Sequence, residues 1–285
     1  MAKGAALTIG LNSVDPNHYQ GWSGDLMACE ADAHDMTQIA KSRGFSTSTL
    51  LTKNATRGAV TQAIRSHAGA LAAGDIFMLS YSGHGGQLPD LNGDEDDAED
   101  ETWCLYDGEL LDDELYQGLA TFPAGVRVLV FSDSCHSGTA VKAAYYTAGG
   151  TTTYAARTTR ELGGGAGETC YRTMPTAVAL RTYQANQAMY DPILKDRQVR
   201  ESRAKVKASV LLLSGCQDNQ LSADGTFNGL FTGTLKRVWN GGKFRSSYRT
   251  FRDRIVSRMP PEQTPNYFTV GAPNPQFEEQ RPFSV

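Results

Sequence analysis

Apolar residues gather in short runs along the chain, and longer amphipathic stretches separate these runs. The apolar or β-branched runs predict strands at residues 5–12, 46–51, 75–81, 127–131, 208–213 and 266–270. The stretches between them predict helices near residues 25–43, 56–73, 112–122, 227–239 and 247–259. Strands that are separated by helices need crossover connections. The pattern therefore predicts an α/β fold with a mainly parallel sheet.

The composition is that of an ordinary globular protein. The chain has 285 residues, of which 40% are hydrophobic and 20% charged, and its formal net charge is −4. This charge argues against a nucleic-acid partner, since such partners need a broad basic field. No apolar run approaches the roughly 18 residues of a membrane helix, and residues 5–11 are too short for a signal peptide. We therefore expect a cytoplasmic protein without a membrane segment.

The cysteines indicate reduced thiols rather than a disulfide framework. Their number is odd, their spacing is wide and no CxxC pair occurs, at Cys29, Cys104, Cys135, Cys170 and Cys216. Neither a set of disulfides nor a zinc ribbon fits this arrangement. At least one thiol is therefore available for chemistry.

The middle of the chain has a different composition. From about Ala143 to Lys207 it is rich in Thr, Gly, Ala and Arg, with a glycine cluster at 163–167. No strand precedes the cluster and no Lys-Ser/Thr pair follows it, so a linker is favoured over a phosphate-binding loop. We expect a long, partly mobile segment with one helix.

Two of the predicted strands run directly into loops that carry reactive side chains, His84 and Cys135. Neighbouring parallel strands would bring these loops together at one edge of the sheet, where open α/β sheets bind ligands. An imidazole can remove the thiol proton and later protonate a leaving amine. The amides of Gly85 and Cys135 are the natural donors to an oxyanion. His136 is a second candidate base, although adjacent residues at a strand end point in opposite directions.

These residues carry a resemblance to a known family. The segments YSGHG at 81–85 and DSCHSG at 133–138 resemble the two catalytic motifs of metacaspases and bacterial orthocaspases, in the caspase-like clan of cysteine peptidases. The segment SGCQDNQLSAD at 214–224 is similar to their small-subunit region. The spacing of about fifty residues between His and Cys agrees with caspases, although their Gln-Ala-Cys context is absent. The resemblance covers about residues 1–145 and 206–270.

The resemblance implies a caspase-like three-layer α/β/α sandwich with a roughly six-stranded sheet. It implies a single peptidase domain over residues 1–285. Residues 1–145 would form a large-subunit-like part, 146–207 a flexible linker and 208–285 a small-subunit-like part. Metacaspases generally act as monomers, so a monomer is expected here.

The implied activity is that of a cysteine endopeptidase that cuts proteins or peptides after Arg or Lys. Cys135 would be the nucleophile and His84 the base. Asp32 and Asp133 match the acidic residues of the metacaspase S1 pocket, and carboxylates are suitable partners for a basic side chain. Two alternatives stay open: a catalytically silent scaffold with this fold, and a calcium-binding regulatory module.

The calcium question arises from the acidic run at 94–101, which holds seven carboxylates in eight residues. Such a run is usually a solvated loop, and an EF-hand is excluded because Glu95 stands where that loop needs glycine. The calcium ligands of metacaspases match Asp100, Asp112 and Asp113. The fourth position is Lys142, a cation that opposes calcium. The chemistry needs no cofactor, and Ca²⁺ is considered only as an activator.

Basic residues in the middle segment are candidates for self-cleavage. A flexible basic segment between two halves of an Arg/Lys-specific peptidase is an accessible substrate for the enzyme itself. The candidates are Arg157, Arg160, Arg172, Arg181, Lys195, Arg197, Arg200 and Arg203. Self-cleavage would make the chain a zymogen.

Overall fold

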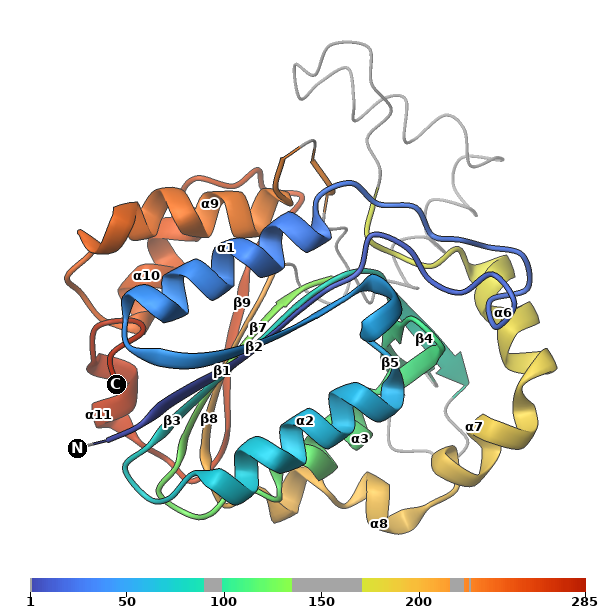
Figure 1. Cartoon of the computed structure of the whole chain (residues 1–285), viewed down its shortest axis with the longest axis horizontal. Helices are drawn as coiled ribbons and strands as arrows, with labels where there is room; N and C mark the ends of the chain where they lie inside the picture. The colour runs from blue at the N-terminus through green and yellow to red at the C-terminus, as the bar shows by residue number, and fades with distance from the viewer. Residues whose placement is uncertain (1, 90–98, 135–170, 216–222, 226) are drawn as a thin grey trace.

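The centre of the protein is a six-stranded sheet in the order β2-β1-β3-β7-β8-β9. A computed structural model describes residues 2–89, 99–134, 171–215, 223–225 and 227–285 (Figure 1). The strands are β1 (Gly4–Gly10), β2 (Phe45–Leu51), β3 (Ile76–Ser82), β7 (Arg127–Asp133), β8 (Ser209–Ser214) and β9 (Asn266–Gly271). All neighbouring pairs are parallel except β8 and β9. The predicted α/β fold with a mainly parallel sheet is confirmed.

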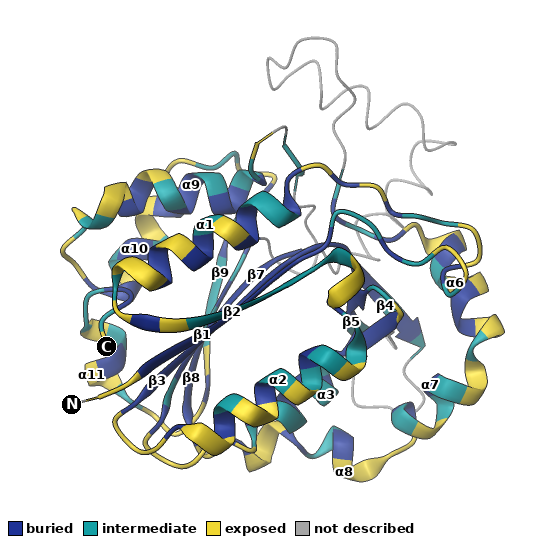
Figure 2. Ribbon diagram, viewed as in Figure 1, coloured by how far each residue is buried: buried dark blue, intermediate teal, exposed yellow. Residues whose placement is uncertain are grey.

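Helices cover both faces of this sheet. One face packs against α2 (Arg57–Ala70) and α3 (Asp112–Leu119). The other face packs against α1 (Cys29–Ser42), α9 (Leu230–Trp239) and α10 (Tyr248–Val256). Figure 2 shows buried strands between helices whose outer faces are exposed.

Burial on two faces explains the apolar strand sequences. β1 and β3 are buried along their whole length, as expected for the inner strands of a parallel sheet. Alternate residues face opposite layers: Leu7 and Leu79 pack in the α2–α3 core, and Ala6 and Met78 in the α1–α9–α10 core.

A second, smaller sheet was not expected from the sequence. It is antiparallel and consists of β4 (Gly85–Pro89), β5 (Glu99–Leu105) and β6 (Gly108–Leu111). The first residues of β5 belong to the acidic run, whose charges indicate a loop rather than a strand. The sheet lies directly after β3, so it extends from the end of the large sheet where the reactive loops begin.

The described part of the middle segment contains more regular structure than the single predicted helix. It folds into α6 (Thr176–Ala185), α7 (Gln187–Leu194) and the short α8 (Arg197–Arg200). Tyr190 and Leu194 of α7 are buried with Leu88 and Leu111 of the small sheet. This packing holds the segment against the small sheet (Figure 1).

Short elements complete the fold. They are the 3-10 turns η1 (Thr52–Asn54), η2 (Arg203–Lys205) and η3 (Asn240–Gly242), and the helix α11 (Pro275–Glu279). Among the described residues, none of the helices has the length and apolar character that crossing a bilayer requires.

Candidate active site

The two motif loops leave neighbouring strands in register. β3 and β7 pair in parallel with Ser82 opposite Asp133, and the Gly83 amide donates to the Asp133 carbonyl at 3.4 Å. The chain continues to His84 from one strand and through Ser134 to Cys135 from the other. The strands are thus neighbours, as predicted. Cys135, with its proposed amide donor, and His136 lie outside the described residues.

The imidazole of His84 is held by the backbone of another loop. The ring is buried, and its Nε2 lies 3.0 Å from the carbonyl oxygen of Gly24. A carbonyl only accepts, so we assign the ring proton to Nε2 and the lone pair to Nδ1. Nδ1 is buried and has no hydrogen-bond partner among the described residues. The ring of Trp22 packs against it, with centroids 4.7 Å apart.

Burial controls the charge of this imidazole. It lowers the pKa of His84 to about 4, against a smaller opposing effect of the Gly24 carbonyl and with the help of the nearby Arg172 cation. The ring is therefore neutral at physiological pH, the form that can accept a proton.

A buried arginine lies beside His84 in a pocket of three carboxylates. The guanidinium of Arg172 is fully buried and lies 2.7 Å from Asp32, 3.0 Å from Asp133 and 2.8 Å from Asp224. It also donates to the hydroxyl of Ser82 at 2.7 Å, and that hydroxyl donates to Asp32 at 2.8 Å. We call these three carboxylates the acidic pocket.

The amino end of α9 holds the acidic pocket in place. The Gly229 amide donates to Asp32, and the Thr232 amide and hydroxyl donate to Asp133 at 3.1 and 2.7 Å. Free amides and the helix dipole both favour carboxylates at this end. Gly229 also allows a close approach, because a Cβ atom there would lie 2.5 Å from Nη2 of Arg172.

Among the described residues, the pocket contains three carboxylates and only one guanidinium. Burial works against the cation of Arg172, but Asp133, Asp32 and Asp224 outweigh it and raise the pKa of the guanidinium well above its usual value. Burial raises the pKa of Asp32, and the attraction of Arg172 opposes this. Three carboxylates around one guanidinium make a site that is selective for a cation.

The backbone around Arg172 is paired on both sides, because Tyr171 and Thr173 each form an isolated β-bridge. The Gly85 amide donates to the Arg172 carbonyl at 3.0 Å, and the Met174 amide donates back to the Gly85 carbonyl at 2.8 Å. Tyr171 forms an antiparallel bridge with Ala223. The predicted oxyanion donor Gly85 therefore holds the carbonyl of the residue whose side chain fills the acidic pocket.

Comparison with known proteins settles the family. The chain matches the peptidase family described as Caspase domain over residues 3–283. It belongs to the caspase domain family of cysteine peptidases. Relatives include Metacaspase-1 of Schizosaccharomyces pombe, 31% identical over an alignment of 263 residues that covers 82% of this chain and 58% of that protein. Metacaspase-1 of Pyricularia oryzae is 31% identical over an alignment of 276 residues that covers 90% of this chain and 66% of that protein.

The chain thus spans about three-fifths of the length of the curated relatives it matches. Among solved structures, the protein GSU0716 from Geobacter sulfurreducens is 58% identical, with a TM-score of 0.85 and 99% of each chain covered. Caspase-1 from Spodoptera frugiperda is 12% identical, with a TM-score of 0.50 over 95% of this chain and 86% of that one. The caspase-like α/β/α fold is confirmed.

The caspase domain brings together some of the predicted site residues. Asp32, Asp133, His84 and Gly85 all lie around Arg172. Asp224 joins them, although the sequence analysis placed it only in a family motif and gave it no role. Gly24 was also missed, because a backbone acceptor leaves no side-chain signature.

The other self-cleavage candidates in the caspase domain are placed differently from Arg172. Arg181 is exposed on α6, and Lys195 and Arg197 form exposed ion pairs with Asp191 and Glu201. Arg200 lies at the end of α8, and Arg203 packs over the ring of Tyr116. Arg157 and Arg160 lie outside the described residues.

Calcium binding to the caspase domain stays a prediction. Within the part of the chain that the structure describes, no group of three or more His, Cys, Asp or Glu side chains is placed to hold a metal ion. Asp100 on β5 and Asp112 and Asp113 on α3 therefore form no such group among themselves. Lys142 and residues 94–98 of the acidic run lie outside the described residues.

Proposed function

We propose that this caspase domain is a cysteine endopeptidase that cuts after arginine, with Cys135 as nucleophile and His84 as base. The observation that carries the proposal is the placement of Arg172. Its side chain fills the acidic pocket, its carbonyl accepts from the Gly85 amide, and both lie beside His84. An arginine substrate bound before cleavage would need the same contacts.

The chemistry follows from these positions. The thiol proton of Cys135 passes to Nδ1 of His84, and the sulfur attacks the carbonyl carbon of the arginine. The Gly85 and Cys135 amides stabilise the oxyanion. His84 then gives its proton to the departing amine, the C–N bond breaks, and a thioester remains. Water, deprotonated by His84, hydrolyses the thioester and restores the thiol.

Arginine is expected to be preferred to lysine. Asp133 contacts Nη1 of the guanidinium, and Asp32 and Asp224 both contact Nη2. A planar guanidinium satisfies such an arrangement, whereas a lysine ammonium is a single point charge on a flexible stem.

A peptide panel tests this function. Fluorogenic peptides that end in Arg, Lys or Asp are offered to the wild type, with and without Ca²⁺ and a thiol-alkylating reagent. We expect turnover in the order Arg, Lys, Asp, and its loss on alkylation. Asp224→Asn should lower kcat/KM for the Arg peptide at least about tenfold, as expected when a charged contact is lost. The exposed substitution Asp253→Asn is the control. Turnover of the Asp peptide equal to that of the Arg peptide would contradict the proposal, and so would turnover that persists after alkylation.

We further propose that the Arg172–Thr173 bond is the one that the enzyme cuts in itself. Of the candidates in the described residues, Arg172 has its side chain in the acidic pocket and its carbonyl on the oxyanion donor. While it stays there, it excludes any other arginine, so the uncut chain would be a zymogen. The products would be residues 1–172 and 173–285.

Intact-mass analysis and amino-terminal sequencing test this cut. Wild type should yield a fragment that begins Thr-Met-Pro-Thr, and Cys135→Ala should remain full length. Arg172→Gln should abolish that fragment, and Arg181→Gln should leave it unchanged. If Arg172→Gln folds poorly because three carboxylates lose their partner, Arg172→Lys keeps a charge and should be cut more slowly. A fragment that begins elsewhere would overturn the assignment.

A further inference from the structure

One part of this acidic chain has a strong local excess of positive charge. Residues 236–258 cover the end of α9, the following turn and α10, and they contain eight Lys or Arg residues and one carboxylate, Asp253. The whole chain, in contrast, has a formal net charge of −4. A surface designed only for solubility does not need such a separation of charge.

These cations fall into two groups. Three have carboxylate partners: Lys236 with Asp35, Arg249 with Glu278, and Arg252 with Asp253. The other five are exposed and have no ion pair among the described residues, namely Arg237, Lys243, Arg245, Arg254 and Arg258. All five line one groove of about 500 Å³, which we call the α9–α10 groove.

The remaining lining residues suit an anion. Asn240, Ser246 and Thr250 add neutral hydrogen-bond donors, and no carboxylate lines the groove. Two of the five cations make hydrogen bonds that the structure shows, and in both the acceptor is uncharged. Arg237 donates to the Thr234 hydroxyl at 2.9 Å and Arg258 to the Arg254 carbonyl at 3.1 Å. Within the described residues, the charge of the groove therefore has no internal counterion.

Ordinary structural roles explain only part of this arrangement. Cations stabilise helix carboxyl ends, which accounts for Arg237 on α9 and Arg254 on α10. This stabilisation of helix ends does not account for Lys243 and Arg245, which lie between the helices. Arg254 near the end of α10 and Arg258 in the following turn lie close together, with Arg258 donating to the Arg254 carbonyl, and their like charges repel. The pKa of nearby Arg281 is lowered by burial and then by Arg245 and Arg43, so repulsion extends beyond the groove.

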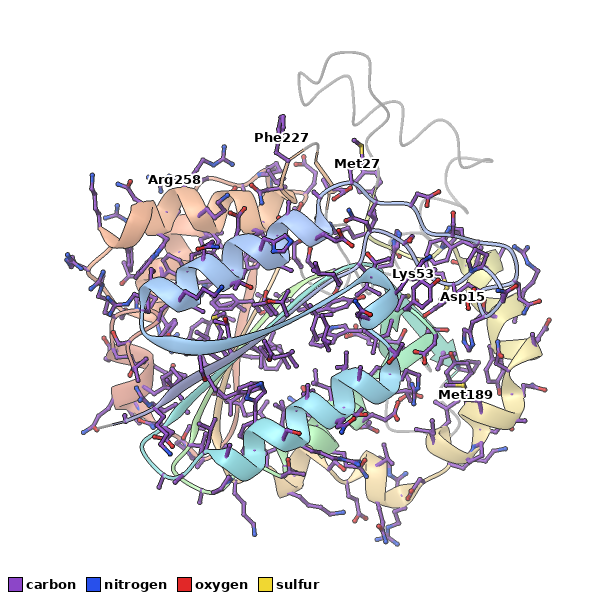
Figure 3. The ribbon with its side chains drawn as sticks, in the orientation of Figure 1. Asp15, Met27, Lys53, Met189, Phe227 and Arg258 are labelled. Carbon is purple, nitrogen blue, oxygen red and sulfur yellow. The ribbon has the colours of Figure 1, made fainter. Side chains whose placement is uncertain are left out.

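We propose that the α9–α10 groove binds a compact, multiply charged phosphate anion, such as tripolyphosphate or the triphosphate of a nucleotide. Guanidinium groups match phosphate oxygens in geometry, and a concave site surrounded by several of them favours a small ligand of high charge density. Figure 3 shows Arg258 on the outside of the α9–α10 layer, whereas Phe227 projects near the amino end of α9. The groove is therefore separate from the acidic pocket, which the amino end of α9 holds.

Calorimetric titration with sodium tripolyphosphate tests the proposal. The uncut Cys135→Ala chain is used, so the result does not depend on peptidase activity and its failure would leave the proposed function untouched. We expect binding that weakens as salt increases from low to physiological ionic strength. Arg245→Gln combined with Arg254→Gln should weaken it at least about tenfold, because two charged contacts are lost.

The matched control removes the same charge from the same region. Arg249→Gln combined with Arg252→Gln deletes two cations that already have carboxylate partners, and it should leave the affinity unchanged. If the groove variant is unstable by thermal unfolding, Lys243→Gln combined with Arg258→Gln replaces it. Equal weakening by the groove and control pairs, or affinity no higher than for chloride at matched ionic strength, would overturn the proposal. Tighter binding of single-stranded DNA or an acidic peptide would also overturn it, in favour of a macromolecular partner.

Discussion

Individual contacts explain the residues of the segment YSGHG. The hydroxyl of Tyr81 donates to the carbonyl of His84 at 2.7 Å, and the Cys104 amide donates to the same oxygen at 2.9 Å. The Ser82 hydroxyl joins Asp32 to Arg172. The Gly85 amide holds the Arg172 carbonyl. One short segment thus fixes the imidazole, supports the acidic pocket and supplies an amide to the carbonyl, so its parts depend on one another.

Gly24 positions the base through its carbonyl, and we predict that Gly24→Ala impairs turnover. Its φ of 55° is disfavoured for alanine, and a Cβ atom would lie 2.9 Å from the Trp22 ring and 3.1 Å from the His84 ring. We expect kcat to fall about tenfold or more with little change in KM, since a misplaced base affects the chemical step. Gly21→Ala is the control, because φ is 88° there and a Cβ atom would meet nothing within 4 Å. An equal effect of both variants would mean that backbone strain alone is responsible.

The pH dependence of stability should report the burial of His84. Its pKa is about 4 in the folded chain and about 6.5 when unfolded, so unfolding takes up a proton between these values. The stabilisation is complete above pH 6.5 and is lost as pH falls towards 4, by up to about 3 kcal/mol. Urea unfolding of Cys135→Ala at pH 7 and pH 5, with and without His84→Gln, measures this contribution. If the free energy of unfolding depends on pH equally in the His84→Gln background, other groups are responsible for that dependence.

At the residue scale, the sequence predicted the reactive pair through its motifs but not the occupant of the pocket. Asp32 was found only through family resemblance, since on its own it reads as a solvated helix residue. Arg172 was one of eight similar basic residues. What distinguishes it is the meeting of Asp32, Asp133 and Asp224, which are distant in sequence. No local sequence pattern shows that these three carboxylates lie together in the fold.

At the scale of elements, the small antiparallel sheet and the α6–α7 segment form one packed unit with a buried acid inside it. The side chain of Glu109 is fully buried and accepts from the Thr102 hydroxyl at 2.6 Å, while its other oxygen has no partner in the described part of the chain. The backbone amide of Glu109 donates to the hydroxyl of Tyr190 on α7 at 2.9 Å. The middle segment is thereby joined to the sheet that begins at Gly85.

We predict that Glu109→Gln stabilises the fold at alkaline pH. Burial raises the pKa of Glu109 to about 8, from 4.5 in an exposed carboxyl group. The folded chain therefore keeps a proton that the unfolded chain releases, so stability falls as pH rises from 4.5 through 8, by a few kcal/mol at most. Urea unfolding at pH 6 and pH 8.5 should show this loss in Cys135→Ala and not after Glu109→Gln. Glu262→Gln, at an exposed position, should still lose stability between pH 6 and pH 8.5. If Glu109→Gln shows the same loss, the pKa assignment is wrong.

The elements that sequence reasoning missed have a common cause. Inner strands of the large sheet, such as β1 and β3, are buried on two faces, so they are apolar runs that the sequence pattern reveals directly. β5 begins with Glu99 and Asp100, and α6 to α8 lie in a Gly- and Arg-rich region. Their structure depends on packing partners such as Leu88 and Leu111, which are distant in sequence.

At the scale of the whole molecule, one sheet joins the parts on either side of the middle segment. β7 pairs with β8 from Arg127 opposite Ser209 to Ser132 opposite Ser214. We therefore predict that residues 1–172 and 173–285 stay associated after a cut at Arg172. Size-exclusion chromatography of the cut enzyme should give one peak at the elution volume of uncut Cys135→Ala, and denaturing electrophoresis should show two fragments. Separate peaks would contradict the prediction, and an earlier shared peak would indicate an oligomer instead of the expected monomer.

The pairing of Arg172 with Gly85 and Asp224 also has a kinetic consequence. The scissile bond is delivered by the same polypeptide, so conversion of the zymogen should be unimolecular. The half-time of conversion should stay constant over a roughly hundredfold dilution. If one molecule cut another, the half-time would increase in proportion to the dilution. A time course at several dilutions distinguishes the two. A constant half-time would mean that each copy matures alone, at a rate independent of how many copies surround it.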